Sequence, residues 1–281
     1  MTAALVNRII PFSSVDGPGN RTVFFLQGCN FNCGYCHNPE TIHVCNNCGA
    51  CVSACPTGAI RLIDGKVRYQ REVCCACDAC LRACPRDASP KVDVMPPEQA
   101  LAILQQNRPF IRGVTASGGE CTLQRDFLLA LFRGAKVMGL STLLDSNGSY
   151  DFENDTELLS VCDGVMLDVK CADPLAHRDL TGQSNELVIK NLAFLASIGK
   201  LEEVRTVVVP GVLPNEDTVR RVCDVLAPLW ASGTAIGYKL IRFRPLGVRQ
   251  NYQNISIPSE SSMEKLREIV RNAGCDRVEV I

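Results

Sequence analysis

The sequence predicts an α/β fold, a partial (β/α)6 TIM-like barrel that carries a cysteine-rich insert. Two observations predict the barrel: short β-rich runs alternate with helical patterns along the chain, and each run is followed by a turn signal. Six such units are too few to close an eight-stranded barrel. A third observation, a repeated cysteine run, separates an insert at residues 41–91 from a barrel made of residues 1–40 and 92–281.

The strands of the barrel are expected where short apolar and β-branched runs occur, as in buried parallel sheets. These runs are Thr22–Leu26, Gly113–Ala116, Ser141–Leu144, Val165–Val169, Val204–Val209 and Lys239–Phe243. Helices are expected in the segments between and after them. These segments are Pro97–Gln106, Gln124–Met138, Glu186–Ile198, Asp217–Trp230 and Glu260–Asn272. Ser259 is expected to cap the last helix.

Composition limits the possible function classes. At 281 residues and 46% hydrophobic content the chain can bury a full core. A formal net charge of −1 gives no basis for broad nucleic-acid binding, and no apolar run reaches the length of a membrane span. Most of the 17 cysteines are spaced too tightly for mutual disulfides, and we see no signal-peptide pattern. We therefore expect a cytoplasmic protein whose thiols hold metal clusters.

Three cysteines directly after the first expected strand have the spacing C-x3-C-x2-C: Cys29, Cys33 and Cys36. Three thiolates can hold only three irons of a four-iron, four-sulfur cube, whereas electron-carrier clusters are closed by four cysteines. The fourth iron is then free to bind a substrate or cofactor, like an open coordination position at other metals. A zinc site or a set of buried thiols is the alternative interpretation of the triplet.

The residues around this triad resemble those of the radical S-adenosylmethionine (SAM) superfamily, and within it the activating proteins of glycyl-radical enzymes. The resemblance rests on the stretches Asp16–Arg21, Phe24–Asn30 and Cys33–Pro39. It implies a barrel of the radical SAM type, with the open iron chelating the amino and carboxylate groups of SAM. The two-cluster insert, the chain length and Arg244 make the sequence similar to the YjjW-type branch.

The insert contains one internal repeat. A run with the spacing C-x2-C-x2-C-x3-C-P begins at Cys45 and recurs 29 residues later at Cys74. This is the bacterial ferredoxin spacing, in which the fourth cysteine ligates the other cluster. The expected ligand sets are Cys45, Cys48, Cys51 and Cys84 for one [4Fe-4S] cluster, and Cys55, Cys74, Cys77 and Cys80 for the other. Paired zinc ribbons are the alternative, and Cys75 has no assigned role.

Polar residues follow the expected strands, at the edge where ligands bind in parallel β/α folds. By itself, Gly118-Gly119-Glu120 is either a tight turn or a close approach of backbone carbonyls to an ammonium group. Asp168 and Lys170 share one face of a strand, as a surface ion pair or as part of a site. The resemblance implies the second interpretation of both. The SAM contacts it implies are Tyr35, Cys36, His37, Gly118, Gly119, Glu120, Asp168, Val169, Lys170 and Arg244.

Three further residue roles come only from the resemblance. Arg244 occupies the place of a family histidine near the SAM ribose, and it can donate but not accept a hydrogen bond. A monovalent cation beside the SAM carboxylate is implied, and the matching positions are Asp145, Ser146, Met166 and Asp168. Asp16 lies in the loop that resembles the region meeting the glycyl peptide.

The implied function is that of an activating enzyme, a monomer with three [4Fe-4S] clusters. Reductive cleavage of SAM gives a 5′-deoxyadenosyl radical, which removes a Cα hydrogen from a glycine of a partner glycyl-radical enzyme. Reduced flavodoxin or ferredoxin is the electron donor usual for the family. The alternatives are a radical SAM enzyme acting on a small molecule or another macromolecule, a ferredoxin-type electron carrier, and a zinc-based interaction protein. The insert could relay electrons, dock the partner or stabilise the protein.

Overall fold

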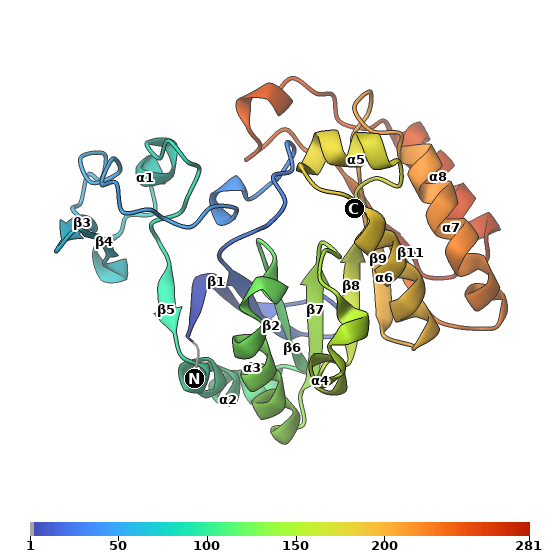
Figure 1. Cartoon of the computed structure of the whole chain (residues 1–281), viewed down its shortest axis with the longest axis horizontal. Coiled ribbons are helices and arrows are strands. Elements are labelled where there is room, and N and C mark those ends of the chain that lie inside the picture. Colours follow the sequence, from blue (N-terminus) through green and yellow to red (C-terminus); the bar gives the residue numbers. More distant parts are fainter. Residues whose placement is uncertain (1–2) are drawn as a thin grey trace.

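The core of the computed structural model, which describes residues 3–281, is a nine-stranded sheet in the order β11-β10-β9-β8-β7-β6-β2-β1-β5 (Figure 1). Its six central parallel strands are β2 (Arg21–Leu26), β6 (Gly113–Gly118), β7 (Ser141–Ser146), β8 (Gly164–Asp168), β9 (Leu201–Val208) and β10 (Gly237–Arg242). Each coincides with a predicted strand to within a few residues. The α/β class and the mostly parallel sheet are therefore confirmed, and the sheet ends in two edges, β11 and β5.

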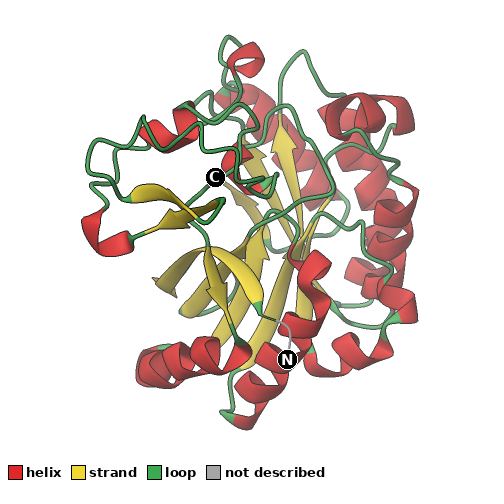
Figure 2. Ribbon diagram, turned by 60° about the vertical axis from the view of Figure 1, so that its left-hand side comes forward, coloured by secondary structure: helices red, strands yellow, loops and turns green. Residues whose placement is uncertain are grey.

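Helices cover the outer side of this sheet (Figure 2). The five predicted helices are present as α2 (Pro97–Asn107), α3 (Arg125–Val137), α6 (Glu186–Ser197), α7 (Asn215–Ala231) and α8 (Glu260–Asn272). The Ser259 side chain accepts a hydrogen bond from the Ser262 amide at 3.2 Å, so the predicted cap of α8 is confirmed. No helix within residues 3–281 is long and apolar enough to cross a membrane.

Several shorter or edge elements were not predicted. The sheet also contains β1 (Ala4–Ser13) and β5 (Asp93–Met95), which are antiparallel to their neighbours, and β11 (Val278–Val280), which is parallel to β10. Strands of three residues carry no readable periodicity. β1 includes Pro11 and two register irregularities against β2, which break its alternation. The short helices α4 (Thr156–Val161) and α5 (Pro174–Thr181) were also missed.

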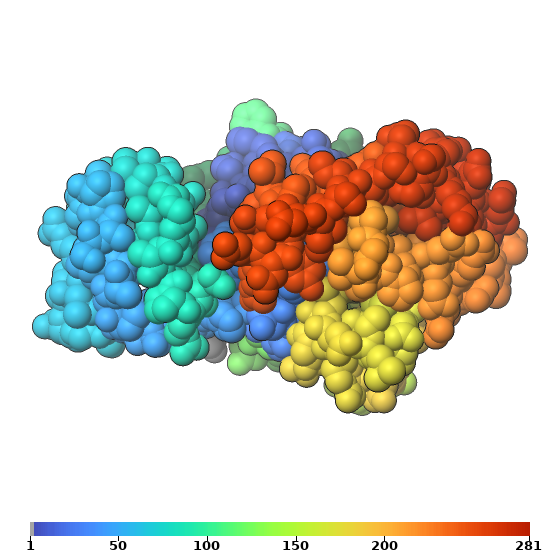
Figure 3. Space-filling view, turned by 90° about the horizontal axis from the view of Figure 1, so that it is seen from above, coloured from blue at the N-terminus to red at the C-terminus, as the bar shows by residue number. Residues whose placement is uncertain are grey.

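Residues between the short 3-10 helix η1 (Pro39–Thr41) and β5 form a separate lobe beside the sheet (Figures 1 and 3). The lobe contains a hairpin of β3 (Ile60–Ile63) and β4 (Lys66–Tyr69), the 3-10 helix η2 (Arg71–Val73) and the short helix α1 (Ala79–Arg82). Cys51, Ile60 and Cys80 form a small buried apolar cluster at its centre.

The 29-residue repeat of the sequence is also present in the backbone of this lobe. Left-handed residues occur in three pairs that are each 29 positions apart. The pairs are Asn47 and Ala76, Gly49 and Asp78, and Gly58 and Asp87. Residues other than glycine adopt a positive φ rarely. The two cysteine runs therefore follow the same backbone path, although only the first has glycines at two of these positions.

Candidate functional site

A cavity of about 370 Å³ lies at the carboxyl ends of the parallel strands. All six central strands, or the loops directly after them, contribute to its wall. Most of the residues predicted for the site line it. They are Asp16, Cys29, Cys33, Tyr35, Cys36, His37, Gly118, Gly119, Asp145, Ser146, Asp168, Lys170 and Arg244. The sheet therefore brings together residues that are more than two hundred positions apart in the sequence.

Three other predicted residues lie behind this wall. Val169 is fully buried in the hydrophobic core, and its amide donates to the Arg205 carbonyl at 2.9 Å. Met166 is also fully buried, with its sulfur 2.9 Å from an Arg205 guanidinium nitrogen. Glu120 is fully buried as well. These side chains support the wall, and their predicted ligand contacts stay predictions.

The three cysteines of the triad share the wall of the cavity on a loop held by backbone hydrogen bonds. The Cys29 amide donates to the Ile42 carbonyl at 2.9 Å, and the Gly34 amide donates to the Leu180 carbonyl at 3.2 Å. Burial raises the pKa of the Cys29 thiol to about 12 and that of Cys33 to about 11. The thiolate form therefore needs cationic partners such as cluster irons. Within residues 3–281, no group of His, Cys, Asp or Glu side chains is arranged to hold a single metal ion.

Gly118 and Gly119 allow the end of β6 to touch the loop that carries Cys29. A Cβ atom on Gly118, whose φ is +124°, would lie 2.2 Å from the Leu26 backbone. A Cβ on Gly119 would lie 2.2 Å from the Gly28 carbonyl oxygen. The approach is fixed by hydrogen bonds from Gly119 N to Leu26 O and from Glu120 N to Gly28 O, at 2.9 and 2.8 Å. Both glycines are required by this contact between neighbouring strand ends.

The Glu120 carboxylate joins the loops that follow β6 and β7. It accepts hydrogen bonds from the Thr122 amide (3.1 Å), the Thr122 hydroxyl (2.6 Å), the Ser146 hydroxyl (3.0 Å) and the Asn147 amide (2.7 Å). Burial raises the pKa of Glu120, and these four donors oppose that shift. Asn147 in turn donates to Asn30 at 3.0 Å and points an amide group at the Cys29 sulfur at 3.7 Å. Glu120 thus positions the triad loop through Asn147.

Asp168 and Lys170 both face the cavity, as their alternation on the strand predicts. The Lys170 Nζ atom lies 2.8 Å from an Asp168 carboxylate oxygen. Burial alone would lower the pKa of Lys170, but Asp168, Tyr35 and Cys33 outweigh it and hold that pKa well above its ordinary value. The ammonium group is therefore charged and is available to an anionic ligand group.

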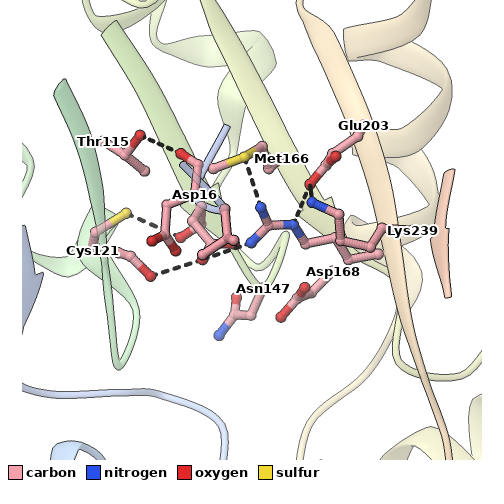
Figure 4. Close-up of polar contacts among 12 residues, drawn as sticks. Asp16, Thr115, Cys121, Asn147, Met166, Asp168, Glu203 and Lys239 are labelled. Carbon is pink, nitrogen blue, oxygen red and sulfur yellow. Dashed lines mark hydrogen bonds and ion pairs between the residues drawn. The ribbon is translucent and has the colours of Figure 1, made fainter. Parts of the chain in front are cut away.

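A network of buried charges that includes Glu203 and Lys239 lies inside the sheet (Figure 4). Arg205 pairs with Asp145 at 3.1 Å and with Glu203 at 2.5 Å, and Lys239 pairs with Glu203 at 3.2 Å. Burial alone would lower the pKa of Arg205, but Asp145 and Glu203 hold it above its ordinary value. Glu203 and Lys239 were not predicted from the sequence. Their signal was a charged residue inside a predicted or adjoining strand: Lys239 lies between apolar residues of β10, and Glu203 is one of three charged residues of β9. A charged residue in a buried strand requires a partner.

The loop that carries Asp16 is held by hydrogen bonds that begin at the fully buried Arg21 side chain. Arg21 donates to the Thr115 hydroxyl (2.8 Å), the Ser141 hydroxyl (2.9 Å) and the Val114 carbonyl (2.8 Å), and burial lowers its pKa to about 10. The Thr115 hydroxyl donates in turn to the Asp16 carbonyl at 2.7 Å. The Asp16 carboxylate, which accepts from the Ser13 hydroxyl, is thereby held at the cavity.

The last wall of the cavity is formed by Tyr35, His37 and the segment after β10. His37 Nε2 lies 3.1 Å from the Arg244 carbonyl oxygen, and burial lowers the pKa of His37. The buried Tyr35 hydroxyl has no hydrogen-bond partner among the described residues. A buried polar group of this kind normally has a partner. A polar ligand in the cavity would therefore provide the missing hydrogen-bond partner of the Tyr35 hydroxyl. The cavity as a whole suits a cluster with bound SAM, because it contains the three thiols, Lys170 and the two glycines.

Comparison with known proteins agrees with this geometry. Residues 23–224 match the family model of the Radical SAM superfamily. The (2S)-3-sulfopropanediol sulfolyase activating enzyme of Bilophila wadsworthia is 34% identical over 79% of this chain and 80% of its own length. The pyruvate formate-lyase-activating enzyme of Streptococcus mutans is 34% identical over 80% of this chain and 73% of its own.

The chain belongs to the glycyl-radical enzyme activating enzymes of the radical SAM superfamily. Membership implies that this activating enzyme uses SAM and a [4Fe-4S] cluster. Among solved structures, Streptococcus suis SuiB bound to its precursor peptide matches with a TM-score of 0.58 at 13% identity, over 92% of this chain and 48% of SuiB. A likeness at that identity concerns the fold alone, and it agrees with the open, mostly parallel sheet of the activating enzyme.

Proposed function

We propose that this activating enzyme generates a glycyl radical on a partner enzyme that carries an acceptor glycine. When bound, the cluster and SAM supply the radical chemistry: one-electron reductive cleavage of SAM, and removal of a glycine Cα hydrogen by the 5′-deoxyadenosyl group. The observation that carries the proposal is that the triad thiols, Lys170 and the Asp16 loop all face one cavity. The protein's own share is binding, orientation and exclusion of water.

The proposed roles of the residues follow from where they lie. Cys29, Cys33 and Cys36 hold the cluster. The turn Gly118-Gly119 offers backbone carbonyls to the SAM ammonium group, and charged Lys170 faces its carboxylate. Tyr35, His37 and Arg244 bind the nucleoside, with Arg244 in place of the family histidine. Asp145, Ser146, Met166 and Asp168 are the proposed region of a monovalent cation.

Asp16 is proposed to contact the backbone of the partner's glycine loop. A glycine loop suits a narrow cavity, because it has no side chain at the reacting carbon. The Asp16 side chain lies at the cavity on a loop that Arg21 holds in place. A rigid carboxylate can accept hydrogen bonds from an incoming peptide amide without first being ordered.

The insert is proposed to hold two further [4Fe-4S] clusters, which gives three in all. The thiols of Cys55, Cys74, Cys77 and Cys80, one predicted ligand set, line a single small pocket together with Cys75. In the other set, burial raises the pKa of Cys51, and the nearby thiols of Cys45 and Cys84, together with Cys80 of the first set, add to this effect. Backbone amides point at the sulfurs of Cys45, Cys74 and Cys84. Proximity therefore supports the first set in full, and Cys45, Cys51 and Cys84 of the second set.

We further propose that the insert relays electrons from reduced flavodoxin or ferredoxin to the triad cluster of a cytoplasmic monomer. Replacing Cys48 or Cys77 with Ala should then slow reduction by the protein donor, while dithionite still supports SAM cleavage. Equal failure with both reductants would give the insert a structural role instead.

Iron analysis tests the ligand sets directly. The anaerobically reconstituted protein should contain about twelve irons, if each of three clusters has four. Cys33→Ala should remove about four of them and abolish SAM cleavage, whereas Cys75→Ala should change neither. Unchanged iron content in Cys33→Ala would contradict the triad assignment.

A further inference from the structure

The segment after β10 covers the outside of the triad loop. A Cβ on Gly34, which lies between Cys33 and Cys36, would come within 2.2 Å of the Tyr252 ring, so the hydroxyl end of this ring packs directly against the glycine. A Cβ on Gly247 would lie 2.9 Å from the His37 carbonyl oxygen. We call residues 244–255 the strap. The strap closes the triad loop from the side that faces the cysteine-rich lobe.

One arginine of the strap reaches both the triad loop and the lobe. Arg249 donates through one guanidinium nitrogen to the Asn32 carbonyl at 3.3 Å and through another to the Asn32 side-chain oxygen. Its Nε atom is buried without a hydrogen-bond partner among the described residues, and lies 3.8 Å from an Asp87 carboxylate oxygen. Asn32 immediately precedes Cys33, and Asp87 follows the proposed ligand Cys84 by three residues.

Asp87 occupies its position against the local backbone preference. Its φ is +50°, and the equivalent residue of the first repeat is Gly58, with a φ of +67°. Glycine adopts this conformation without cost, whereas aspartate does so with some strain. The first repeat has no strap beside it, since Gly58 has open space around it. The second repeat thus replaces a glycine with a carboxylate at the point that faces Arg249.

We propose that Arg249 is a positioning residue that docks the cysteine-rich lobe on the triad loop, by binding Asp87 on one side and Asn32 on the other. The effect of this docking on activity rests on the proposed function. In that function one electron passes from reduced flavodoxin through the lobe to the triad cluster, and no bond forms or breaks. A fixed lobe keeps the distance of that transfer constant. The guanidinium group suits the role because its planar fork serves two partners at once.

The test uses the reconstituted enzyme and the variants Arg249→Ala and Asp87→Gly. Asp87→Gly introduces the residue that the first repeat has at this position. Glycine adopts the positive φ found here without strain, so the substitution should not disturb folding. The control is Arg71→Ala, which removes another contact between lobe and sheet, the exposed ion pair of Arg71 with Asp93 at 2.5 Å. That pair does not involve the triad loop.

The first readout is amide hydrogen exchange in peptides covering residues 30–34 and 84–91. Arg249→Ala should exchange about tenfold faster there, the scale of losing its hydrogen bonds to Asn32. Asp87→Gly should exchange faster by a smaller factor, up to about fivefold, the scale of losing a partly exposed ion pair. Arg71→Ala should resemble the wild type in these peptides. Arg249→Lys should recover part of the protection, because it keeps the charge. Wild-type exchange in both variants would overturn the docking role.

The second readout is the rate of triad reduction. With reduced flavodoxin as donor, Arg249→Ala should be slowed about tenfold and Asp87→Gly by a smaller factor, whereas SAM cleavage driven by dithionite and the iron content stay at wild-type values. Faster exchange with an unchanged flavodoxin rate would support the docking contact and contradict the relay. Equal loss with both reductants would overturn the proposal, because Arg249 would then only maintain the triad loop.

Discussion

Replacing Glu120 with Gln tests how the triad loop is supported. The side chain keeps its size and loses its charge, while its four hydrogen-bond donors remain in place. An amide offers one oxygen, so its NH2 group must face either the Asn147 amide or the donors of Thr122 and Ser146. At least one buried donor is then left without an acceptor.

These contacts set the expected loss in the free energy of unfolding. A hydrogen bond to a charged group contributes about 1.5–3 kcal/mol, and a buried unsatisfied donor costs about 1–3 kcal/mol. Removing a buried charge offsets part of this loss of stability, because burial raises the pKa of Glu120 and so disfavours its ionised form. We expect a net loss of about 2 kcal/mol in the free energy of unfolding. The loss should be local at first, since Asn147 would no longer be held beside Cys29.

The assay is urea unfolding together with iron analysis of the reconstituted protein. Glu120→Gln should lower the urea midpoint and lose triad iron before insert iron. The control is Glu268→Gln, an exposed position of α8, which should change the free energy of unfolding by less than about 0.5 kcal/mol. If Glu120→Gln unfolds at the wild-type midpoint with full iron, the carboxylate does not support the triad loop.

Three further substitutions separate the remaining roles. Lys170→Ala should weaken SAM binding about ten- to hundredfold by calorimetry, because a charge-assisted contact worth roughly 1.5–3 kcal/mol is lost; unchanged affinity would place the SAM carboxylate elsewhere. Asp16→Asn should leave SAM affinity unchanged and reduce the radical signal on the partner, and a wild-type radical yield would limit this loop to a structural role. Gly119→Ala should lower the free energy of unfolding by about 1–3 kcal/mol and reduce the iron content of the triad, because its Cβ would lie 2.2 Å from the Gly28 oxygen. Gly237→Ala, whose nearest neighbour would be 3.3 Å away, is the milder control.

The sequence predicted the parallel strands well, because strands buried on both faces are continuous apolar runs. The residues that follow those runs, such as Asp145 and Lys170, then had to meet at one edge of the sheet. The edge strands could not be predicted in the same way. β5 and β11 are too short to show a period, and they form only because β1 and β10 offer open backbone groups.

The partners of buried polar side chains were also beyond the sequence. Glu120 is next to two glycines in a motif, yet its carboxylate turns inward to Asn147, a choice made by the packing of two loops. Arg21 is part of a recognisable loop, and only the structure shows that it is the buried anchor of that loop. Arg249 had no local signal at all, because both of its partners are distant in sequence.

The proposed activity of this enzyme is removal of a hydrogen atom from a glycine of its partner. The direct measurement uses a glycyl-radical enzyme whose glycines carry deuterium at Cα, incubated anaerobically with the activating enzyme, SAM and reductant. We expect deuterium in 5′-deoxyadenosine by mass spectrometry, and a glycyl radical on the partner by electron paramagnetic resonance. Its acceptor Gly→Ala variant should show neither. Formation of 5′-deoxyadenosine without deuterium, at the same rate with the Gly→Ala partner, would contradict the proposed activity.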